Sequence, residues 1–220
     1  MRGINLVKKS LIGILLIIFL LSIICFECAP PTKSSSGSSI DDDNTDIIIG
    51  DDTSRILPLK IGNTWIYTHI TSAGSFTETL NVTSVTNIGG VDVYRGDSTS
   101  GTSSTYEYHG NHVGDGLYFY GDGGIGIISP CLFLQYPCSV GDSWIYDRWG
   151  GTYTVQSIST IVTVDAGSFE CIVYYYRRDT ATGLTEHFEY WAPGIGMIKN
   201  NVYKDHDLID SIGLVSYSIL

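Results

Sequence analysis

Hydrophobic and polar residues alternate in short runs along most of the chain, from about Leu57 to Leu220. No long stretch of this part repeats its apolar residues at the 3.6-residue spacing of a helix. The runs are rich in valine, isoleucine, threonine, tyrosine and phenylalanine, and glycine-containing turn signals separate them. The expected strands are Asn63–His69, Phe76–Val85, Val91–Arg95, Ser104–His109, Leu117–Tyr120, Ser143–Arg148, Tyr153–Val164, Phe169–Arg177, Leu184–Trp191 and Ile212–Ile219. The pattern predicts one all-β domain of roughly ten to thirteen mostly antiparallel strands.

The strand pattern occurs twice. The segment from Pro58 to Tyr67 matches the segment from Pro137 to Tyr146, and Tyr106-Glu107-Tyr108 matches Phe188-Glu189-Tyr190 further on. The similar offsets predict two units of roughly eighty residues, about 57–135 and 136–220. Each unit carries a Trp-Ile-Tyr run that places its tryptophan and tyrosine on one face of a strand. Trp65 and Trp144 are therefore predicted to be core residues, with sugar stacking as the alternative.

The N-terminal residues 1–24 have the layout of a lipoprotein-type export signal. Arg2, Lys8 and Lys9 precede an uncharged apolar run from Leu11 to Ile24, and Cys25 ends the run as in a bacterial lipobox. We therefore expect cleavage before Cys25 and lipidation of its sulfur, which anchors the chain to a membrane of the cell envelope. An uncleaved anchor is the first alternative, because the apolar segment approaches the ~20 residues that span a bilayer. Ordinary secretion is the second.

Residues 25–54 are predicted to form a flexible tether between the anchor and the domain at 55–220. Small residues fill Ser34–Ser39, and acidic ones dominate Asp41–Asp46. Such a composition buries too little apolar area to offset the entropy of ordering. The acidic run lacks the glycine and the glutamate that a calcium loop of the EF-hand type requires, so it is interpreted as a solvated charge run.

The charge of the chain limits its partners. The full sequence carries a net charge of −11, and removal of residues 1–24 leaves 9 basic and 23 acidic residues, a net charge of −14. A surface of this sign repels phosphate backbones and anionic headgroups, which argues against nucleic-acid binding. The membrane is therefore expected as a partner only through the lipid anchor.

The sequence contains no motif that points to catalysis, and we predict no catalytic residue, cofactor or metal. It has no HExxH, GxSxG or phosphate-binding glycine loop. The one close pair of histidines, His109 and His112, is interpreted as exposed loop residues, with a metal site as the minor alternative. Most carboxylates lie in predicted turns, so a hydrolase with two facing carboxylates is the least favoured class.

Three cysteines lie in the domain. Cys131 and Cys138 flank a short loop and are the candidate disulfide in an oxidising compartment, which leaves Cys171 as a small buried apolar residue. A bridge from Cys171 to either of the others is the competing pairing.

Fifteen tyrosines are the remaining compositional anomaly. Tyr118, Tyr120, Tyr174 and Tyr176 are candidate binding aromatics, because tyrosine offers apolar area with a hydroxyl tip at a low entropic cost. The alternative is that their frequency reflects ordinary β-propensity.

Three segments resemble an uncharacterised family of bacterial secreted proteins and lipoproteins: Pro58–Tyr67, Ala166–Cys171 and Tyr190–Lys199. The resemblance implies an envelope-associated sheet curled into an open or half-open barrel, and it supplies no catalytic residues. The first unit departs from it, since His109-Gly110-Asn111-His112 stands where the second has Trp191-Ala192-Pro193-Gly194. We therefore predict a non-enzymatic, membrane-tethered envelope lipoprotein with an interaction or binding role. A carrier or chaperone for an apolar ligand or lipid is the alternative.

Overall fold

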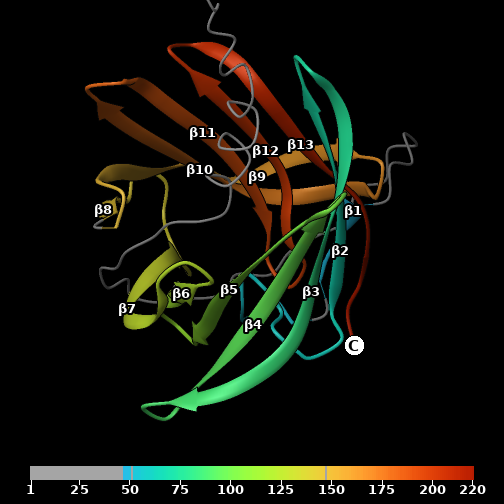
Figure 1. The fold of residues 1–220 in the computed structure, drawn as a ribbon, viewed down its shortest axis with the longest axis vertical. Helices are drawn as coiled ribbons and strands as arrows, with labels where there is room; N and C mark the ends of the chain where they lie inside the picture. The colour runs from blue at the N-terminus through green and yellow to red at the C-terminus, as the bar shows by residue number, and fades with distance from the viewer. Residues whose placement is uncertain (1–46, 51, 147) are drawn as a thin grey trace, which may run out of the picture.

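The computed structural model describes residues 47–50, 52–146 and 148–220, and they form a single antiparallel sheet (Figure 1). Its thirteen strands are β1 (Ile47–Ile48), β2 (Thr64–Thr71), β3 (Gly74–Ile88), β4 (Val91–Ser100), β5 (Ser103–His112), β6 (Gly116–Asp122), β7 (Gly126–Gln135), β8 (Ser143–Tyr146), β9 (Gly151–Val164), β10 (Gly167–Thr180), β11 (Gly183–Ala192), β12 (Gly196–Lys204) and β13 (Asp207–Ser218). The predicted all-β class is confirmed. Within the described ranges, no helical segment has the length and apolar character that a membrane crossing needs.

Three strands, β1, β7 and β12, are absent from the predicted set. Strand β7 contains Pro130, which cannot donate a backbone hydrogen bond and argues against a central strand. The structure places β7 at the end of the sheet, where a proline is tolerated. Strand β12 carries Asn200, Asn201 and two lysines, which resemble a loop composition. Only the pairing of this segment with β11 and β13 identifies it as a strand.

The strand order is β7-β6-β5-β4-β3-β2-β13-β12-β11-β10-β9-β8, with β1 paired in parallel to β10. Strands β2–β7 therefore form one meander and β8–β13 a second, and the pairing of β2 with β13 joins them. We call these the first and second halves of the sheet. The two halves begin with matching backbone hydrogen bonds: Gly62 N donates to Val82 O and Gly141 N donates to Val155 O, each at 2.9 Å. Both glycines have positive φ, at 96° and 93°. The duplication stays a prediction, which this match supports.

The sheet is neither closed nor strongly curled. The resemblance predicted a sheet curled into an open or half-open barrel, and this prediction is wrong in its curvature. Closure requires the two end strands to pair with a staggered register. Strand β8 has only four residues and pairs with β9, and β7 pairs with β6. Among the described residues no backbone pairing links β7 to β8.

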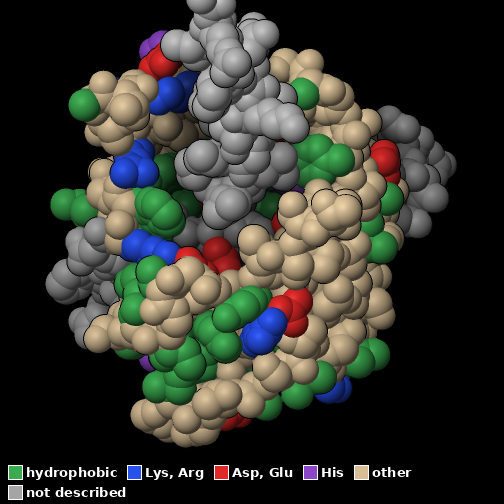
Figure 2. All heavy atoms as spheres, viewed as in Figure 1, with side chains coloured by type: hydrophobic (Ala, Val, Ile, Leu, Met, Phe, Trp, Pro, Cys, Tyr) green, Lys and Arg blue, Asp and Glu red, His purple; other side chains and the backbone are tan. Residues whose placement is uncertain are grey.

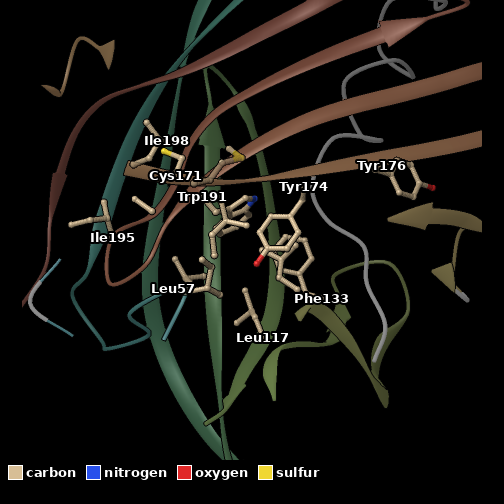
Figure 3. Close-up of a cluster of buried hydrophobic side chains, with 14 of the residues drawn as sticks. Leu57, Leu117, Phe133, Cys171, Tyr174, Tyr176, Trp191, Ile195 and Ile198 are labelled. Atoms are coloured by element: carbon tan, nitrogen blue, oxygen red, sulfur yellow. The ribbon is translucent and has the colours of Figure 1, made fainter. Parts of the chain in front are cut away.

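The two halves nevertheless share one core (Figure 3). The rings of Phe133 on β7 and Trp191 on β11 lie edge to face at 5.1 Å, and the Tyr174 hydroxyl donates to Gln135 O at 2.9 Å. Burial of each large apolar side chain contributes about 1.5–3 kcal/mol. Trp65 and Trp144 are both buried, which confirms them as core residues.

The described end of the predicted tether lies against the domain. Ile47 and Ile48 pair with Ser168 and Phe169 of β10. A Cβ on Gly50 would lie only 2.5 Å from the backbone of Gly194, so the two segments of backbone approach closely there. The remainder of the tether, the export signal and Cys25 lie outside the described residues. The domain boundaries stay predictions.

Candidate functional site

A cavity of about 130 Å³ lies between the two halves of the sheet. Strands from both halves line it: β2 contributes Trp65, β11 contributes Glu189 and β12 contributes Asn200. Figure 2 shows basic and acidic side chains next to one another near the middle of one face, with hydrophobic side chains below them. The volume is close to that of an engineered cavity of ~150 Å³ that admits benzene. One ring or a short chain therefore fits.

The apolar wall of the cavity is built from aromatic side chains whose polar atoms are satisfied elsewhere. Trp65 Nε1 donates to Ile195 O at 2.7 Å, and the Tyr67 hydroxyl donates to Met197 O at 3.2 Å. Phe133 also lines the space. These rings present apolar faces to the cavity without leaving a buried donor unpaired.

Glu189 is a buried carboxylate of the cavity and accepts two hydrogen bonds. Its Oε1 accepts from the Tyr153 hydroxyl at 2.9 Å, and its Oε2 accepts from Trp191 Nε1 at 3.0 Å. Burial raises the pKa of the Glu189 carboxyl to about 7, although these two bonds act in the opposite direction. His187 Nδ1 lies 3.9 Å from Oε1, and burial lowers the pKa of this imidazole to about 4, which keeps it neutral at pH 7.

Three residues that line the same cavity each carry a polar atom that is buried without a hydrogen-bond partner among the described residues: His109 Nε2, Arg178 Nε and Asn200 Oδ1. His109 Nε2 lies 3.8 Å from Glu107 Oε2, too far for a hydrogen bond. Burial lowers the pKa of His109 to about 3 and raises that of Glu107. An unpaired buried polar atom costs about 1–3 kcal/mol. These atoms are therefore suited to groups of a ligand.

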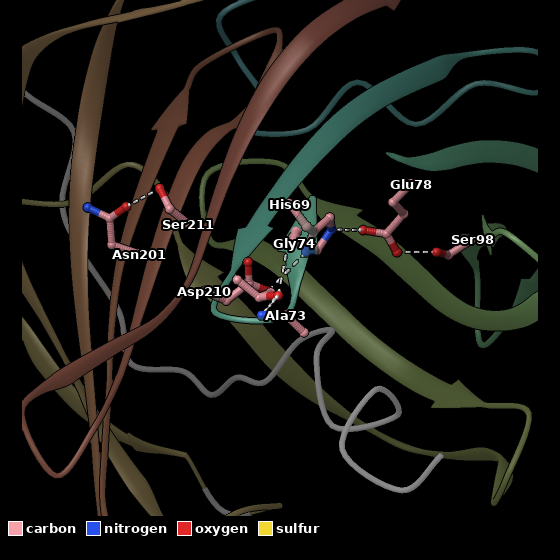
Figure 4. Close-up of polar contacts among 9 residues, drawn as sticks. His69, Ala73, Gly74, Glu78, Ser98, Asn201, Asp210 and Ser211 are labelled. Atoms are coloured by element: carbon pink, nitrogen blue, oxygen red, sulfur yellow. Dashed lines mark hydrogen bonds and ion pairs between the residues drawn. The ribbon is translucent and has the colours of Figure 1, made fainter. Parts of the chain in front are cut away.

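A second polar cluster spans the junction of the two halves (Figure 4). His69 Nε2 lies 2.9 Å from Glu78 Oε2 and His69 Nδ1 lies 3.0 Å from Asp210 Oδ2, while the Ser98 hydroxyl donates to Glu78. Burial alone would lower the pKa of His69, but the hydrogen bonds and charges of Asp210 and Glu78 raise it to about 9. The serine contacts the carboxylate and not the imidazole, which is the wrong order for a nucleophile and its base.

The structure does not gather the four candidate tyrosines at one site. Tyr176 alone lines the cavity. Tyr118 stacks on His112 at 3.8 Å, and the Tyr120 hydroxyl lies 2.9 Å from His112 Nε2. Tyr174 is buried in the core. Ligand contact therefore stays a prediction for Tyr176.

His109 and His112 also separate, because His109 lines the cavity whereas His112 contacts the two tyrosines of β6. The expectation that both are exposed loop residues is wrong, since both lie on β5 and His109 is buried. In the described part of the chain, no group of three histidine, cysteine, aspartate or glutamate residues is placed to hold a metal ion.

The domain cysteines occupy three different environments. Cys131 is half-buried on β7, and the half-buried Cys138 has its sulfur 3.6 Å from the Tyr174 hydroxyl. Cys171 is fully buried, and burial raises the pKa of its thiol to about 12, as expected for a small core residue. The disulfide between Cys131 and Cys138 stays a prediction.

Glu189 and Asn200 were missed as candidate site residues. A signal for Glu189 was present, because it alternates with His187 and Trp191 and so shares the inward face of the strand. Glu107 occupies the matching position of the first unit and also lines the cavity. For Asn200 no such signal exists, because β12 was not predicted.

The fold is similar to one described as YmcC-like. It is similar to a protein of Bacteroides fragilis that is assigned as exported and has a YmcC-like fold, with a TM-score of 0.51 and 13% sequence identity over 74% of this chain and 98% of that one. A protein of Parabacteroides distasonis assigned as a lipoprotein gives a TM-score of 0.48 at 13% identity, with the same coverage of 74% and 98%. A scan against protein families finds no match, and neither does a search of curated proteins. At this identity, the likeness to the first structure concerns the fold alone.

Proposed function

We propose that the chain is a lipid-anchored, extracytoplasmic binding protein that holds a small amphipathic ligand in the cavity between the two halves. The observation that carries this proposal is the set of unpaired buried polar atoms, His109 Nε2, Arg178 Nε and Asn200 Oδ1, in a largely aromatic and aliphatic cavity. Such a combination of apolar lining with a few convergent polar groups is typical of ligand sites.

The cavity volume limits the ligand. Sites for drug-sized molecules measure ~300–1,000 Å³, more than the 130 Å³ found here. A carrier that encloses a whole lipid would need more room than this. The volume favours one ring or a short chain, either free or at the end of a longer molecule.

A binding role is favoured over catalysis because Ser98, the one serine among the described lining residues, donates to Glu78 instead of contacting a base. A general acid or nucleophile has to be within reach of the reacting atom of a substrate.

Binding is tested with benzyl alcohol and the full-length chain in lipid nanodiscs, by isothermal titration calorimetry against empty nanodiscs. Leu80 lines the cavity, so Leu80→Phe should fill part of it and weaken binding at least roughly tenfold. Val85 is exposed on the same strand, and Val85→Phe is the matched control that should bind like the unchanged chain. Equal binding by both variants would exclude the cavity as the ligand site.

The anchor is tested by Cys25→Ser, which removes the sulfur that would carry the lipid. The intact mass of the unchanged chain should show the loss of residues 1–24 and the gain of acyl chains, and Cys25→Ser should show neither change. Cys28→Ser is the matched control and should be processed like the unchanged chain. An unchanged chain that keeps residues 1–24 and carries no acyl chain would instead identify an uncleaved anchor.

A further inference from the structure

One corner of the cavity combines a buried carboxylate with an unpaired acceptor. Glu189 on β11 and Asn200 on β12 are directly opposite in the strand register. Opposite residues on one face of an antiparallel pair have Cβ atoms about 4.5–5.5 Å apart. Both line the cavity, Asn200 is only 5% exposed, and its Oδ1 has no partner among the described residues. The corner therefore offers at least two oxygen acceptors to a single group.

The charge of Glu189 is not balanced by the protein. In the described ranges no lysine or arginine forms an ion pair with it, and the nearby His187 is held neutral by burial. Its two hydrogen bonds come from the neutral donors Tyr153 and Trp191. A carboxylate accepts about four hydrogen bonds in total, so lone pairs remain available. A buried carboxylate without a counter-charge is costly, and a bound cation would remove that cost.

The surroundings of this corner also favour a cation. Trp65, Tyr153, Tyr176 and Trp191 line the same cavity. Aromatic faces carry partial negative charge and attract an ammonium group. The two acidic groups that the first half contributes to the lining are less suited. Arg148 already acts on Glu107 and lowers its pKa against the effect of burial, and Glu78 is already bonded to His69 and Ser98.

The one arginine among the described lining residues is far from this corner. Arg178 is paired with Thr185 in the register, and Thr185 precedes Glu189 by four positions on β11. Four strand residues span about 13 Å. The Glu189 carboxylate therefore has no arginine of the described lining next to it.

We propose that the cavity selects a small organic cation, a primary ammonium on an apolar ring or short chain, whose N–H groups donate to Glu189 and to Asn200 Oδ1. The apolar part of the ligand then packs against Trp65 and Phe133. This inference rests on the proposed binding function and adds the chemical class of the ligand.

The test compares three ligands of nearly equal shape: benzylammonium, benzyl alcohol and benzoate. Titrations use the full-length chain in nanodiscs at pH 8, above the pKa of about 7 of Glu189, so that its carboxyl is ionised. A charge-assisted hydrogen bond should make benzylammonium bind roughly tenfold or more tightly than benzyl alcohol. Glu189→Gln should reduce this preference to within roughly threefold and leave benzyl alcohol binding intact. Glu170→Gln, the same change at an exposed site on β10, should leave the preference unchanged.

The outcomes separate the two proposals. Similar binding of all three ligands, or a preference that survives Glu189→Gln, would overturn the cation proposal and leave the binding function standing. Tighter binding of benzoate would also overturn it and would point to Arg178 as the selecting group. Failure of all three ligands to bind would overturn the binding function itself.

Discussion

The His69 cluster makes the stability of the domain depend on pH in a defined direction. In the folded chain Glu78 and Asp210 raise the pKa of His69 from 6.5 to about 9. Between these two values the folded state binds one proton more than the unfolded state, so the free energy of unfolding falls by about 1.4 kcal/mol per pH unit. The stabilisation is fully present below pH 6.5 and is lost as the pH rises through about 9. The protonation of His69 therefore contributes about 3 kcal/mol to the stability at low pH.

The measurement is urea unfolding of the full-length chain in nanodiscs between pH 6 and pH 10, followed by circular dichroism. Other groups titrate in this range, so the reference is the triple variant His69→Gln, Glu78→Gln and Asp210→Asn, which keeps side-chain size and polarity but carries no charge in the cluster. The free energy of unfolding of the unchanged chain, relative to that variant, should fall by about 3 kcal/mol across the range. A difference that stays constant with pH, or that grows, would refute the assignment of a charged His69 between two carboxylates.

Two further predictions concern the turns and ends of strands. Gly121 has a φ of 141°, and a Cβ there would lie 1.9 Å from Gly126 O, so Gly121→Ala should cost several kcal/mol, measured by urea unfolding. Gly90→Ala, at positive φ but in open space, should cost only about 1 kcal/mol, and equal losses would argue against the steric explanation. The buried Asn63 side chain makes two hydrogen bonds to backbone groups, those of Pro58 and Leu220, so Asn63→Ala should lower the melting temperature through a loss of about 2 kcal/mol. Asp142→Ala, at the matching but only half-buried position, should cost about half as much, and the reverse order would contradict this account.

The candidate site was only partly predictable. The tyrosines at 118, 120, 174 and 176 were chosen because they are aromatic and alternate along strands, yet only Tyr176 reaches the cavity. Alternation tells which side chains share a face of one strand, but it does not tell which strands enclose a space. Glu189 could have been found from its alternation with Trp191. Its partner Asn200 needed the register of two strands, of which one was not predicted.

The amino-acid sequence by itself determined the strand class, most of the strand positions and the inward orientation of Trp65 and Trp144. These features depend on neighbours along the chain, since the period of a strand is two residues and glycine permits positive φ locally. The tertiary structure alone decided that β2 pairs with β13, that the sheet stays open, and that His69 lies between Glu78 and Asp210. Each of these depends on contacts between residues far apart in the chain, and a local pattern does not encode which distant strand will be its partner.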